Sequence, residues 1–329
     1  MSKKKLLIGV DEAGYGPSMG PLTICATAWR VPMGLDASEM TSMLEPELLA
    51  KPIKQNSVHV PIGDSKKIHR DEYAVEGLIL GSRFLSFAID GKVPTEWDAK
   101  IASFAKEDWS RLASIPWYVK RPSAHAMILD TKFPDQANYF QAAFQKTQSL
   151  EMQLVGIRMR VIDEIDFNRQ VDRTGNKSTL LSEASLALVK QVIRELSEKG
   201  EDVEVYCDKH GGRNRYQAVL TYSFDEEWFE IEIESRACSR YQAKWDEHAI
   251  RIQFKVDGDS IFPSAAASIV AKWTREELMD RLNGFWESKV AGGIKATAGY
   301  YVDATRFAKQ IDAAVKKLGL VRDQWWRKK

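Results

Sequence analysis

The sequence predicts an α/β protein built on a mixed β-sheet that is flanked by helices. Two observations lead to this class. Leu6–Val10 and Leu22–Trp29 have the composition of strands, and the turn between them is rich in glycine and proline, so the sheet opens with an antiparallel pair. Further along the chain, strand-like runs alternate with amphipathic helical segments, a pattern that requires crossover connections and parallel pairing.

The middle of the chain continues this alternation. The loop that follows the opening pair is expected to become helical after His69, and Arg83–Ile89 has the pattern of another strand. The segment from about 92 to 150 contains several tryptophans but no strand period, so we expect an inserted, largely helical region. The tryptophans of this segment and of the later one at about 209–248 are expected in the core, or alternatively on an added surface for a partner. Leu154–Val161 is the next predicted strand, and an amphipathic helix ending at Gly200 follows it.

The last third adds strands and two helices. Residues 203–208 form a short strand, and the alternating patterns of 228–235 and 250–256 predict two neighbouring strands, the first with one buried and one wet face. Opposite charges on this pair suggest cross-strand ion pairs. A helix is expected from a Ser264 cap to about Gly284, and a final helix spans about 304–318.

Composition narrows the class of protein. The 329 residues, 44% hydrophobic and 28% charged, suit a globular protein of one enlarged domain or two ordinary ones, and we expect a cytoplasmic location because the apolar run before Asp11 is too short for a secretory signal. The three cysteines are an odd number without a C-x-x-C pair, so buried free thiols are expected. The net charge of +1 gives no support for nucleic-acid binding. Basic residues around Trp325 and Trp326 fit either a phosphate contact or a solvated chain end.

Acidic residues end three of the predicted strands. They are Asp11 with Glu12, Asp208, and Asp257 with Asp259. Carboxylate oxygens that converge from separate strand ends are ligands for Mg²⁺ or Mn²⁺, and two such ions support hydrolysis of a phosphodiester. Such acids also serve as ordinary turn formers.

The adjacent pair Asp11–Glu12 raises a geometric problem. Successive side chains of a regular strand point to opposite faces, so we expect the backbone to turn at this pair if both acids face one ion. The following Gly14 and Gly16 tolerate a sharp turn. A dinucleotide-binding loop is disfavoured because its glycine spacing differs and the acids would repel a pyrophosphate. His210 is either a metal ligand or proton shuttle, or an exposed loop residue.

Four segments together resemble the type 2 ribonucleases H, the ribonuclease HII family. They are GVDEAGYGPSMGP at 9–21, GDSKK at 63–67, GDSIFPSAAASIVAKWTR at 258–275 and GYYVDATRF at 299–307, in the family's order. The resemblance implies a ribonuclease H-like mixed β-sheet flanked by helices. It also implies a single catalytic domain over 1–329, with insertions at about 92–150 and 209–248 and a C-terminal helical extension at about 285–329.

The resemblance also implies an activity and its residues. Family members cut the RNA strand of RNA/DNA hybrids, or duplex DNA beside ribonucleotides, and leave a 3′-hydroxyl and a 5′-phosphate. The two Mg²⁺ or Mn²⁺ ions would be held by Asp11, Glu12, Asp208 and Asp259. Asp257 competes for the fourth place, and Asp259 is preferred because its distance to Pro263 fits the family pattern.

The substrate-gripping loop departs from the family pattern. The family has Arg or Lys between two glycines, whereas Tyr15 stands between Gly14 and Gly16 and supplies no positive charge. Backbone N–H groups remain available there, and the resemblance implies that Tyr300 packs on the sugar beside the cut. Lys66 or Lys67 would contact phosphate, or would be solvated loop residues.

Two other functions stay open. A non-catalytic hybrid-binding or scaffold relative would keep the fold, and a related nuclease would act on another structured nucleic acid. No membrane association is expected, and the sequence does not identify a protein partner.

Overall fold

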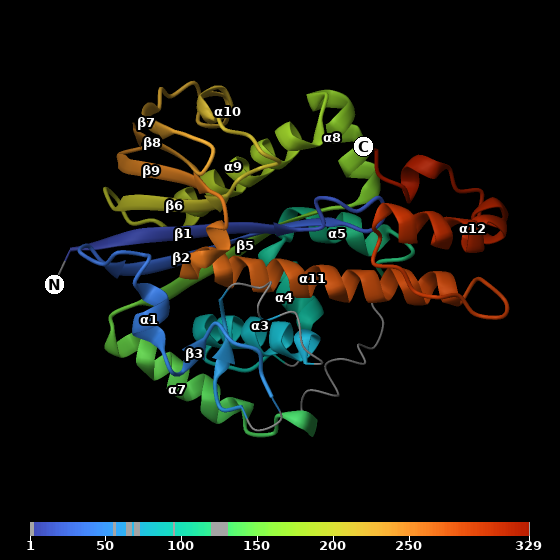
Figure 1. Cartoon of the computed structure of the whole chain (residues 1–329), viewed down its shortest axis with the longest axis horizontal. Coiled ribbons are helices and arrows are strands. Elements are labelled where there is room, and N and C mark those ends of the chain that lie inside the picture. The colour runs from blue at the N-terminus through green and yellow to red at the C-terminus, as the bar shows by residue number, and fades with distance from the viewer. Residues whose placement is uncertain are drawn as a thin grey trace.

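The computed structural model describes residues 3–54, 57–63, 68, 73–94, 96–119 and 131–328. A seven-stranded mixed sheet forms its centre, with the strand order β5-β2-β1-β6-β9-β8-β7 (Figure 1). The strands are β1 (Lys4–Ala13), β2 (Leu22–Pro32), β5 (Gln153–Ile162), β6 (Asp202–Asp208), β7 (Glu230–Glu234), β8 (Cys238–Trp245) and β9 (His248–Lys255). β2 pairs antiparallel with β1 and β5, while β1, β6 and β9 run parallel. The predicted α/β class is confirmed.

One face of the sheet is covered by the long helix α11 (Phe262–Glu287), which packs on β1 and β2. The helix approaches closely because Gly9 has no side chain: a Cβ there would lie 2.0 Å from the carbonyl carbon of Pro263. The hydroxyls of Thr23 and Thr27 donate to the carbonyls of Ala271 (2.9 Å) and Pro263 (2.7 Å). α3 (Ala74–Asp90) packs on the outer side of α11.

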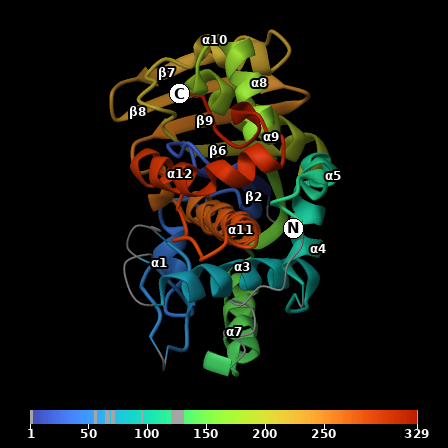
Figure 2. The same cartoon turned by 90° about the vertical axis from the view of Figure 1, so that its right-hand side faces the viewer.

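The opposite face carries α8 (Glu164–Thr174), α9 (Lys177–Leu196) and α10 (Gln217–Ser223). Figure 2 shows these helices on one side of the sheet, with α11 and α3 on the other. The remaining elements lie around this framework. They are α1 (Met40–Leu44), β3 (Leu48–Leu49), β4 (Val60–Pro61), α4 (Trp97–Phe104), α5 (Lys106–Ser114), α7 (Gln136–Ser149), α12 (Tyr301–Lys317), and the 3₁₀ turns η1 (Gly258–Ser260) and η2 (Arg322–Gln324).

Three predictions of local structure are wrong. Arg83–Ile89 lies inside α3, because its apolar residues pack against α11 at helical spacing and Gly81 lets the two helices approach. β8 lies between β7 and β9, which were predicted to be neighbours. Ile231 and Ile233 are 51% and 42% exposed, so β7 at the end of the described sheet buries neither.

The start of α11 also differs from the prediction. The helix begins at Phe262 and continues beyond Gly284 to Glu287, and Ser264 does not cap it. The Ser264 hydroxyl instead donates to the carbonyl of Tyr206 at 2.9 Å, which ties the helix to β6.

Most other predictions of local structure agree with the structure. The described part of 92–150 is mainly helical. Trp117, stacked on Trp286, and Trp245 are buried as expected, whereas Trp228 is 66% exposed, so the expectation of a core position is wrong for that residue. All three cysteines are free, with Cys25 and Cys207 buried and Cys238 partly exposed. Among the helices of the described residues, none combines the length and apolar character needed to cross a membrane.

Candidate active site

Asp11 and Glu12 both belong to the regular part of β1. The pairing with β2 continues through Asp11 and Glu12 to Ala13 without a shift, so the turn that we expected at the two acids is absent there. The chain turns at Gly14, whose φ of +88° is in the left-handed region. Asp11 therefore shares the face of β1 that Gly9 presents to α11, and Glu12 points to the opposite face.

Asp208 lies beside Asp11. β1 and β6 are parallel and pair up to Val10 and Cys207, so the next residue of each strand is an acid on the same face of the sheet. Asp11 is only 7% exposed, and Glu12 and Asp208 are partly buried. The pKa of Glu12 lies well above its usual value, chiefly because the carboxyl is buried and further because Asp11 and Asp208 repel its charge. These three carboxylates therefore interact electrostatically at the ends of two adjacent strands.

The turn η1 brings the fourth predicted position to the same place. Asp208 Oδ1 accepts from the backbone N–H of Lys209 at 2.8 Å and more weakly from that of Gly258 at 3.4 Å. A Cβ at Gly258 would lie 2.7 Å from the Cys207 carbonyl oxygen, so only glycine lets η1 lie against the end of β6. Asp259 belongs to this turn, although its side chain is outside the described part of the structure.

Asp257 remains a competing ligand. Its side chain is exposed, its φ of 56° is unusual for a residue with a Cβ, and together with Asp208 it lines a cavity of about 540 Å³. The structure therefore brings position 208 together with the turn that contains both candidates, and the choice between them stays a prediction.

The donor set is suited to a hard divalent cation. Carboxylate oxygens are what Mg²⁺ and Mn²⁺ prefer, and a cation would offset the repulsion that raises the pKa of Glu12. The described side chains do not already form a group of three or more acidic, histidine or cysteine ligands around one point. Metal binding would thus require the side chains at the strand ends to close around the ion.

Of the residues predicted to bind substrate, Tyr300 lies next to the loop that contains Gly14, Tyr15 and Gly16. A Cβ on Gly16 would be 3.8 Å from the Tyr300 ring. The N–H groups of Ser18 and Met19 donate to the Gly299 carbonyl at 2.8 and 3.2 Å. These bonds fix residues 14–20, which we call the glycine loop, to the segment before α12. Tyr300 is 58% exposed next to this loop. Lys66 and Lys67, like the predicted helical start after His69, fall outside the described residues.

Tyr15 turns toward α9 and the loop after β6. Lys177 Nζ lies 4.9 Å from the centre of the Tyr15 ring, and a Cβ on Gly211 would be 2.7 Å from its hydroxyl. Burial, followed by repulsion from Glu12, raises the pKa of the Tyr15 hydroxyl. Lys177 thus brings to this loop a positive charge that Tyr15 does not carry. Its position near the start of α9 gave no indication of this contact in the sequence.

The C-terminal tail clamps the glycine loop through hydrogen bonds from Arg327 to the carbonyls of the loop. Arg327 is 1% exposed, and its guanidinium donates to the carbonyls of Gly14 (2.5 Å) and Tyr15 (3.2 Å) while it lies 3.8 Å from the centre of the Phe167 ring. The backbone N–H of Arg327 donates to the Ser18 carbonyl at 2.7 Å. Burial, followed by the charge of Arg275, lowers the pKa of Arg327 to about 9.

The rest of the tail is fixed in place as well. The Asn168 amide donates to the carbonyls of Asp323 (2.9 Å) and Trp326 (2.8 Å), and Trp325 and Trp326 are buried. Neither interpretation made from the sequence, a phosphate contact or a solvated end, describes Trp325, Trp326 and Arg327, because all three are packed inside the protein.

This clamp sets the direction of the loop peptides. In a trans peptide the C=O and the following N–H point in opposite directions. Because Arg327 holds the Gly14 and Tyr15 carbonyls, the N–H groups of Tyr15 and Gly16 point away from Arg327. Two successive N–H groups aimed the same way form a concavity suited to an anion.

The far end of the loop is held by a buried acid that the sequence did not single out. Glu164 accepts from the N–H of Gly20 at 2.9 Å and from the Tyr118 hydroxyl at 3.0 Å. Complete burial raises the pKa of Glu164 to about 7. Glu164 is the first residue of α8, after the capping Asp163, and acids are common at such positions, so the sequence carries no signal for this role.

His210 is structural. The expectation that it is solvent exposed is wrong: it is 1% exposed, its ring packs edge-on to Tyr216 and Phe254, and Nδ1 lies 3.0 Å from the Ser182 hydroxyl. Burial lowers the pKa of His210 to about 3. The ring is therefore neutral near neutral pH and does not gain a proton there.

Comparison with known proteins finds similarity in structure only. No family model matches the chain, and no curated protein matches its sequence. Among solved structures, ribonuclease H2 from Pyrococcus horikoshii OT3 is 14% identical with a TM-score of 0.42, over 97% of this chain and 92% of that one. The RNase HII of Archaeoglobus fulgidus, solved in complex with PCNA, is 13% identical with a TM-score of 0.39, over 97% and 93%.

A third structure, Bst-RNase HIII in complex with Mn²⁺, is 12% identical with a TM-score of 0.41, over 98% of this chain and 66% of that one. The chain is thus similar to ribonucleases HII and HIII along nearly its whole length. At these identities and TM-scores no residue role is transferred from them, and the roles proposed below depend on the geometry of this chain.

Proposed function

We propose that this chain is a divergent type 2 ribonuclease H, a divalent-metal-dependent endonuclease. Its substrate would be the RNA strand of RNA/DNA hybrids, or duplex DNA at ribonucleotides. The observation that carries the proposal is the side-by-side position of Asp11 and Asp208 on parallel strands, next to Glu12, whose pKa is raised chiefly by burial and further by both aspartates. In this proposal the whole chain is one catalytic domain, to which 92–150 and 209–248 are additions.

The metal would be held by Asp11, Glu12, Asp208 and Asp259, with Asp257 as the competitor of the last. Bound there, Mg²⁺ or Mn²⁺ would lower the pKa of a water and stabilise the departing 3′-oxygen. The carboxylates supply the negative charge that retains the cation. Asp208 is oriented for this role by the N–H groups of Lys209 and Gly258, which fix one of its oxygens.

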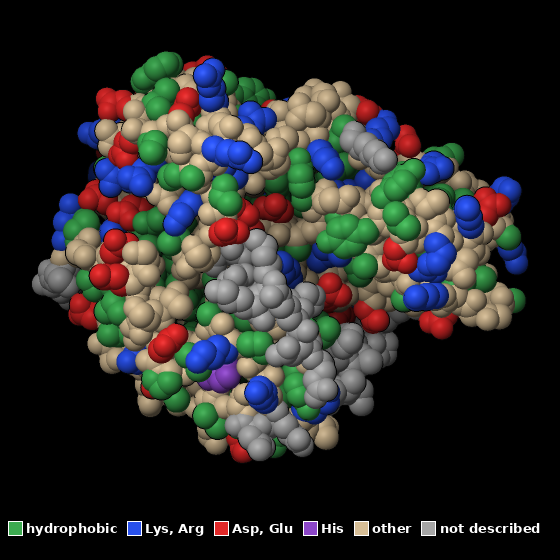
Figure 3. Space-filling model, in the orientation of Figure 1, with side chains coloured by type: hydrophobic (Ala, Val, Ile, Leu, Met, Phe, Trp, Pro, Cys, Tyr) green, Lys and Arg blue, Asp and Glu red, His purple; other side chains and the backbone are tan. Residues whose placement is uncertain are grey.

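Substrate positioning would come from the loop and Tyr300. The N–H groups of Tyr15 and Gly16, turned outward by Arg327, would donate to a phosphate or a ribose hydroxyl. Tyr300, exposed beside Gly16, would pack on the sugar next to the cut. Lys177 would attract the phosphate backbone to a chain whose charge is otherwise balanced. The face in Figure 3 shows basic and acidic side chains mixed, without a wide patch of one sign.

Product analysis tests this function. An RNA/DNA hybrid, a DNA duplex with one ribonucleotide and an all-DNA duplex are incubated with Mg²⁺ or Mn²⁺, and the ends of the products are identified. We expect cutting of the first or second substrate, with 3′-hydroxyl and 5′-phosphate ends, and its loss in Asp11→Asn and Asp208→Asn variants that stay folded. Cutting of the all-DNA duplex alone would identify a nuclease with another substrate. Hybrid binding without cutting, and without a rise of Tm on adding metal, would identify a non-catalytic relative.

A further inference from the structure

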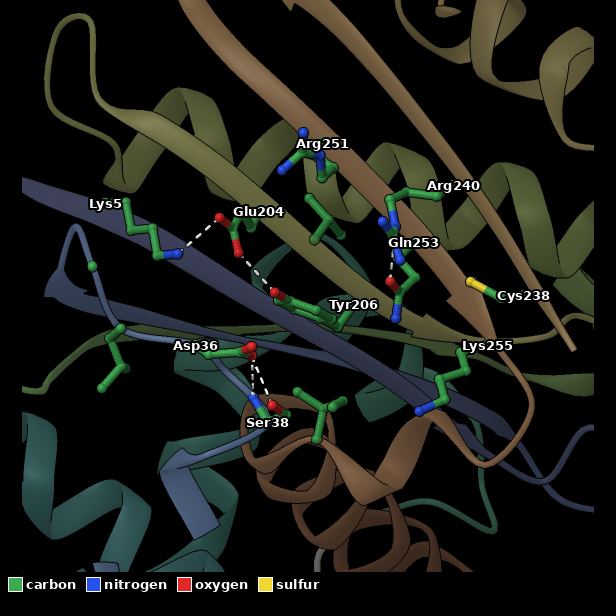
Figure 4. Close-up of a pocket in the computed structure, with 14 residues that line it drawn as sticks. Lys5, Asp36, Ser38, Glu204, Tyr206, Cys238, Arg240, Arg251, Gln253 and Lys255 are labelled. Atoms are coloured by element: carbon green, nitrogen blue, oxygen red, sulfur yellow. Dashed lines mark hydrogen bonds and ion pairs between the residues drawn. The ribbon is translucent and has the colours of Figure 1, made fainter. Parts of the chain in front are cut away.

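One part of the sheet is left open beside the candidate site. α11 covers β1 and β2, while on the same face β6, β9 and β8 present polar side chains to a cavity of about 600 Å³ (Figure 4). The loop at 34–38 and Ile261 form the other wall. We call this cavity the β9 trough and define it by six of its lining residues, Lys5, Tyr206, Arg240, Arg251, Gln253 and Lys255.

The charge of the β9 trough is positive. Four basic side chains line it against two acidic ones, in a chain whose net charge is only +1. The acidic residues are Asp36, which bonds to Ser38, and Glu204, which pairs with Lys5 at 2.8 Å. Arg240, Arg251 and Lys255 lie on the side of the β9 trough formed by β8 and β9.

Two of the basic groups, Arg251 and Lys255, lie in a row on β9 that reaches Asp208, one of the proposed metal ligands. Arg251, Gln253 and Lys255 alternate along β9 and so share one face, with a spacing of about 6.6 Å between successive members. Lys255 is in register with Asp208 of β6. The row therefore starts beside Asp208 and leads away from it along the strand.

We propose that the β9 trough binds the sugar-phosphate backbone of the nucleic-acid strand as it leaves the cleavage site. The inference rests on the proposed function and extends it to a second contact region. The two basic members of the row, Arg251 and Lys255, are four residues apart along β9, about 13 Å, which suits every second phosphate of an extended strand. Arginine donates to phosphate through two parallel N–H groups, and the partly exposed ring of Tyr206 offers a surface to a sugar or base.

In the free protein one acidic side chain forms ion pairs with both arginines of the β9 trough. Glu232 of β7 pairs with Arg251 at 2.8 Å and with Arg240 at 3.5 Å, reaching across β8 from the neighbouring strand. Arg251 is half exposed, and exposed ion pairs of this kind contribute little to stability. A backbone phosphate therefore replaces Glu232 at small cost, and removal of the Glu232 charge favours nucleic-acid binding.

The experiment measures binding separately from cutting. A labelled RNA/DNA hybrid with a long single-stranded extension is titrated with the cleavage-deficient Asp11→Asn protein over a range of salt concentrations. Arg251→Gln with Lys255→Gln is expected to weaken binding roughly tenfold and to reduce the slope of log K against log salt by about 1.4, because two contacts to a single strand are lost. Glu232→Gln is expected to strengthen binding several-fold. Lys199→Gln, an exposed lysine that lies outside the β9 trough, is the control and should change neither quantity.

The outcomes separate this inference from the proposed function. A hybrid without the extension should bind the double variant and the parent equally well. Equal affinity and salt slope for the double variant on the extended hybrid, with Tm unchanged, would overturn the β9 trough while the parent enzyme still cuts. Weaker binding in Glu232→Gln would also count against it. If the parent neither cuts nor binds any of these nucleic acids, both proposals fail together.

Discussion

Removing the guanidinium of Arg327 should loosen the glycine loop without touching a carboxylate. Arg327→Ala deletes the hydrogen bonds to Gly14 and Tyr15 and the contact with Phe167, and leaves two carbonyls without their donor. A charge-assisted hydrogen bond contributes about 1.5 to 3 kcal/mol. Part of this is offset because the buried guanidinium is no longer desolvated; its Nε has no hydrogen-bond partner in the described structure. We therefore expect a net loss of about 2–4 kcal/mol.

The assay combines stability with kinetics. The Tm of Arg327→Ala should fall by about 3–6 °C for a chain of this length. The Tm of Arg327→Lys should fall less, because lysine keeps the charge but loses the planar fork. With the metal ligands intact, KM for the hybrid should rise several-fold while kcat changes little. Lys328→Ala is the matched control, since the side chain of this neighbour forms surface ion pairs with Asp172 and Asp323, and alanine keeps the backbone N–H that donates to Asn168. An Arg327→Ala protein with the Tm and KM of the parent would refute the clamp.

Three further outcomes follow from the site. Burial raises the folded-state pKa of Glu164 from about 4.5 to about 7, so the folded protein holds this proton more tightly than the unfolded chain does. The protein should therefore lose up to about 3 kcal/mol of stability as the pH rises from about 4.5 to about 7. Glu164→Gln should abolish this part of the dependence of Tm on pH, and an unaltered curve would count against it. Gly258→Ala should displace η1 and remove cutting; a folded variant that cuts as well as the parent would contradict the close approach of η1 to β6. Mg²⁺ should raise the Tm of the parent but not of Asp208→Asn, and an equal rise in both would place the metal elsewhere.

The sequence predicted the parts of the fold whose patterns are strong and local. β1 and β2 were found because β-branched and apolar residues run uninterrupted between turn residues, and β5 because Ile157, Met159 and Val161 alternate with arginines. Arg83–Ile89 was misassigned because a short apolar run has no distinguishing period, and only its packing on α11 identifies it as helix. The order β9-β8-β7 could not be derived, since pairing between strands depends on contacts that alternation does not encode.

The candidate site shows the same division. Asp11 and Asp208 could be proposed from the sequence because acids at the ends of parallel strands meet at one edge of a sheet. The residues that hold the glycine loop in place could not be predicted from the sequence. Arg327 is 313 residues from Gly14, and Lys177 contacts Tyr15 only through the fold. Glu164 lies in the first turn of α8, where acids are common, and only the fold shows that it is buried and accepts from the backbone N–H of Gly20.

The most direct test of the account is to locate the metal. Crystals of the protein soaked in Mn²⁺ would be examined by anomalous diffraction. We predict a peak within bonding distance of both Asp11 and Asp208, with η1 beside it, and no such peak in Asp208→Asn. A peak bound by other residues, or none between Asp11 and Asp208 at millimolar Mn²⁺, would contradict it.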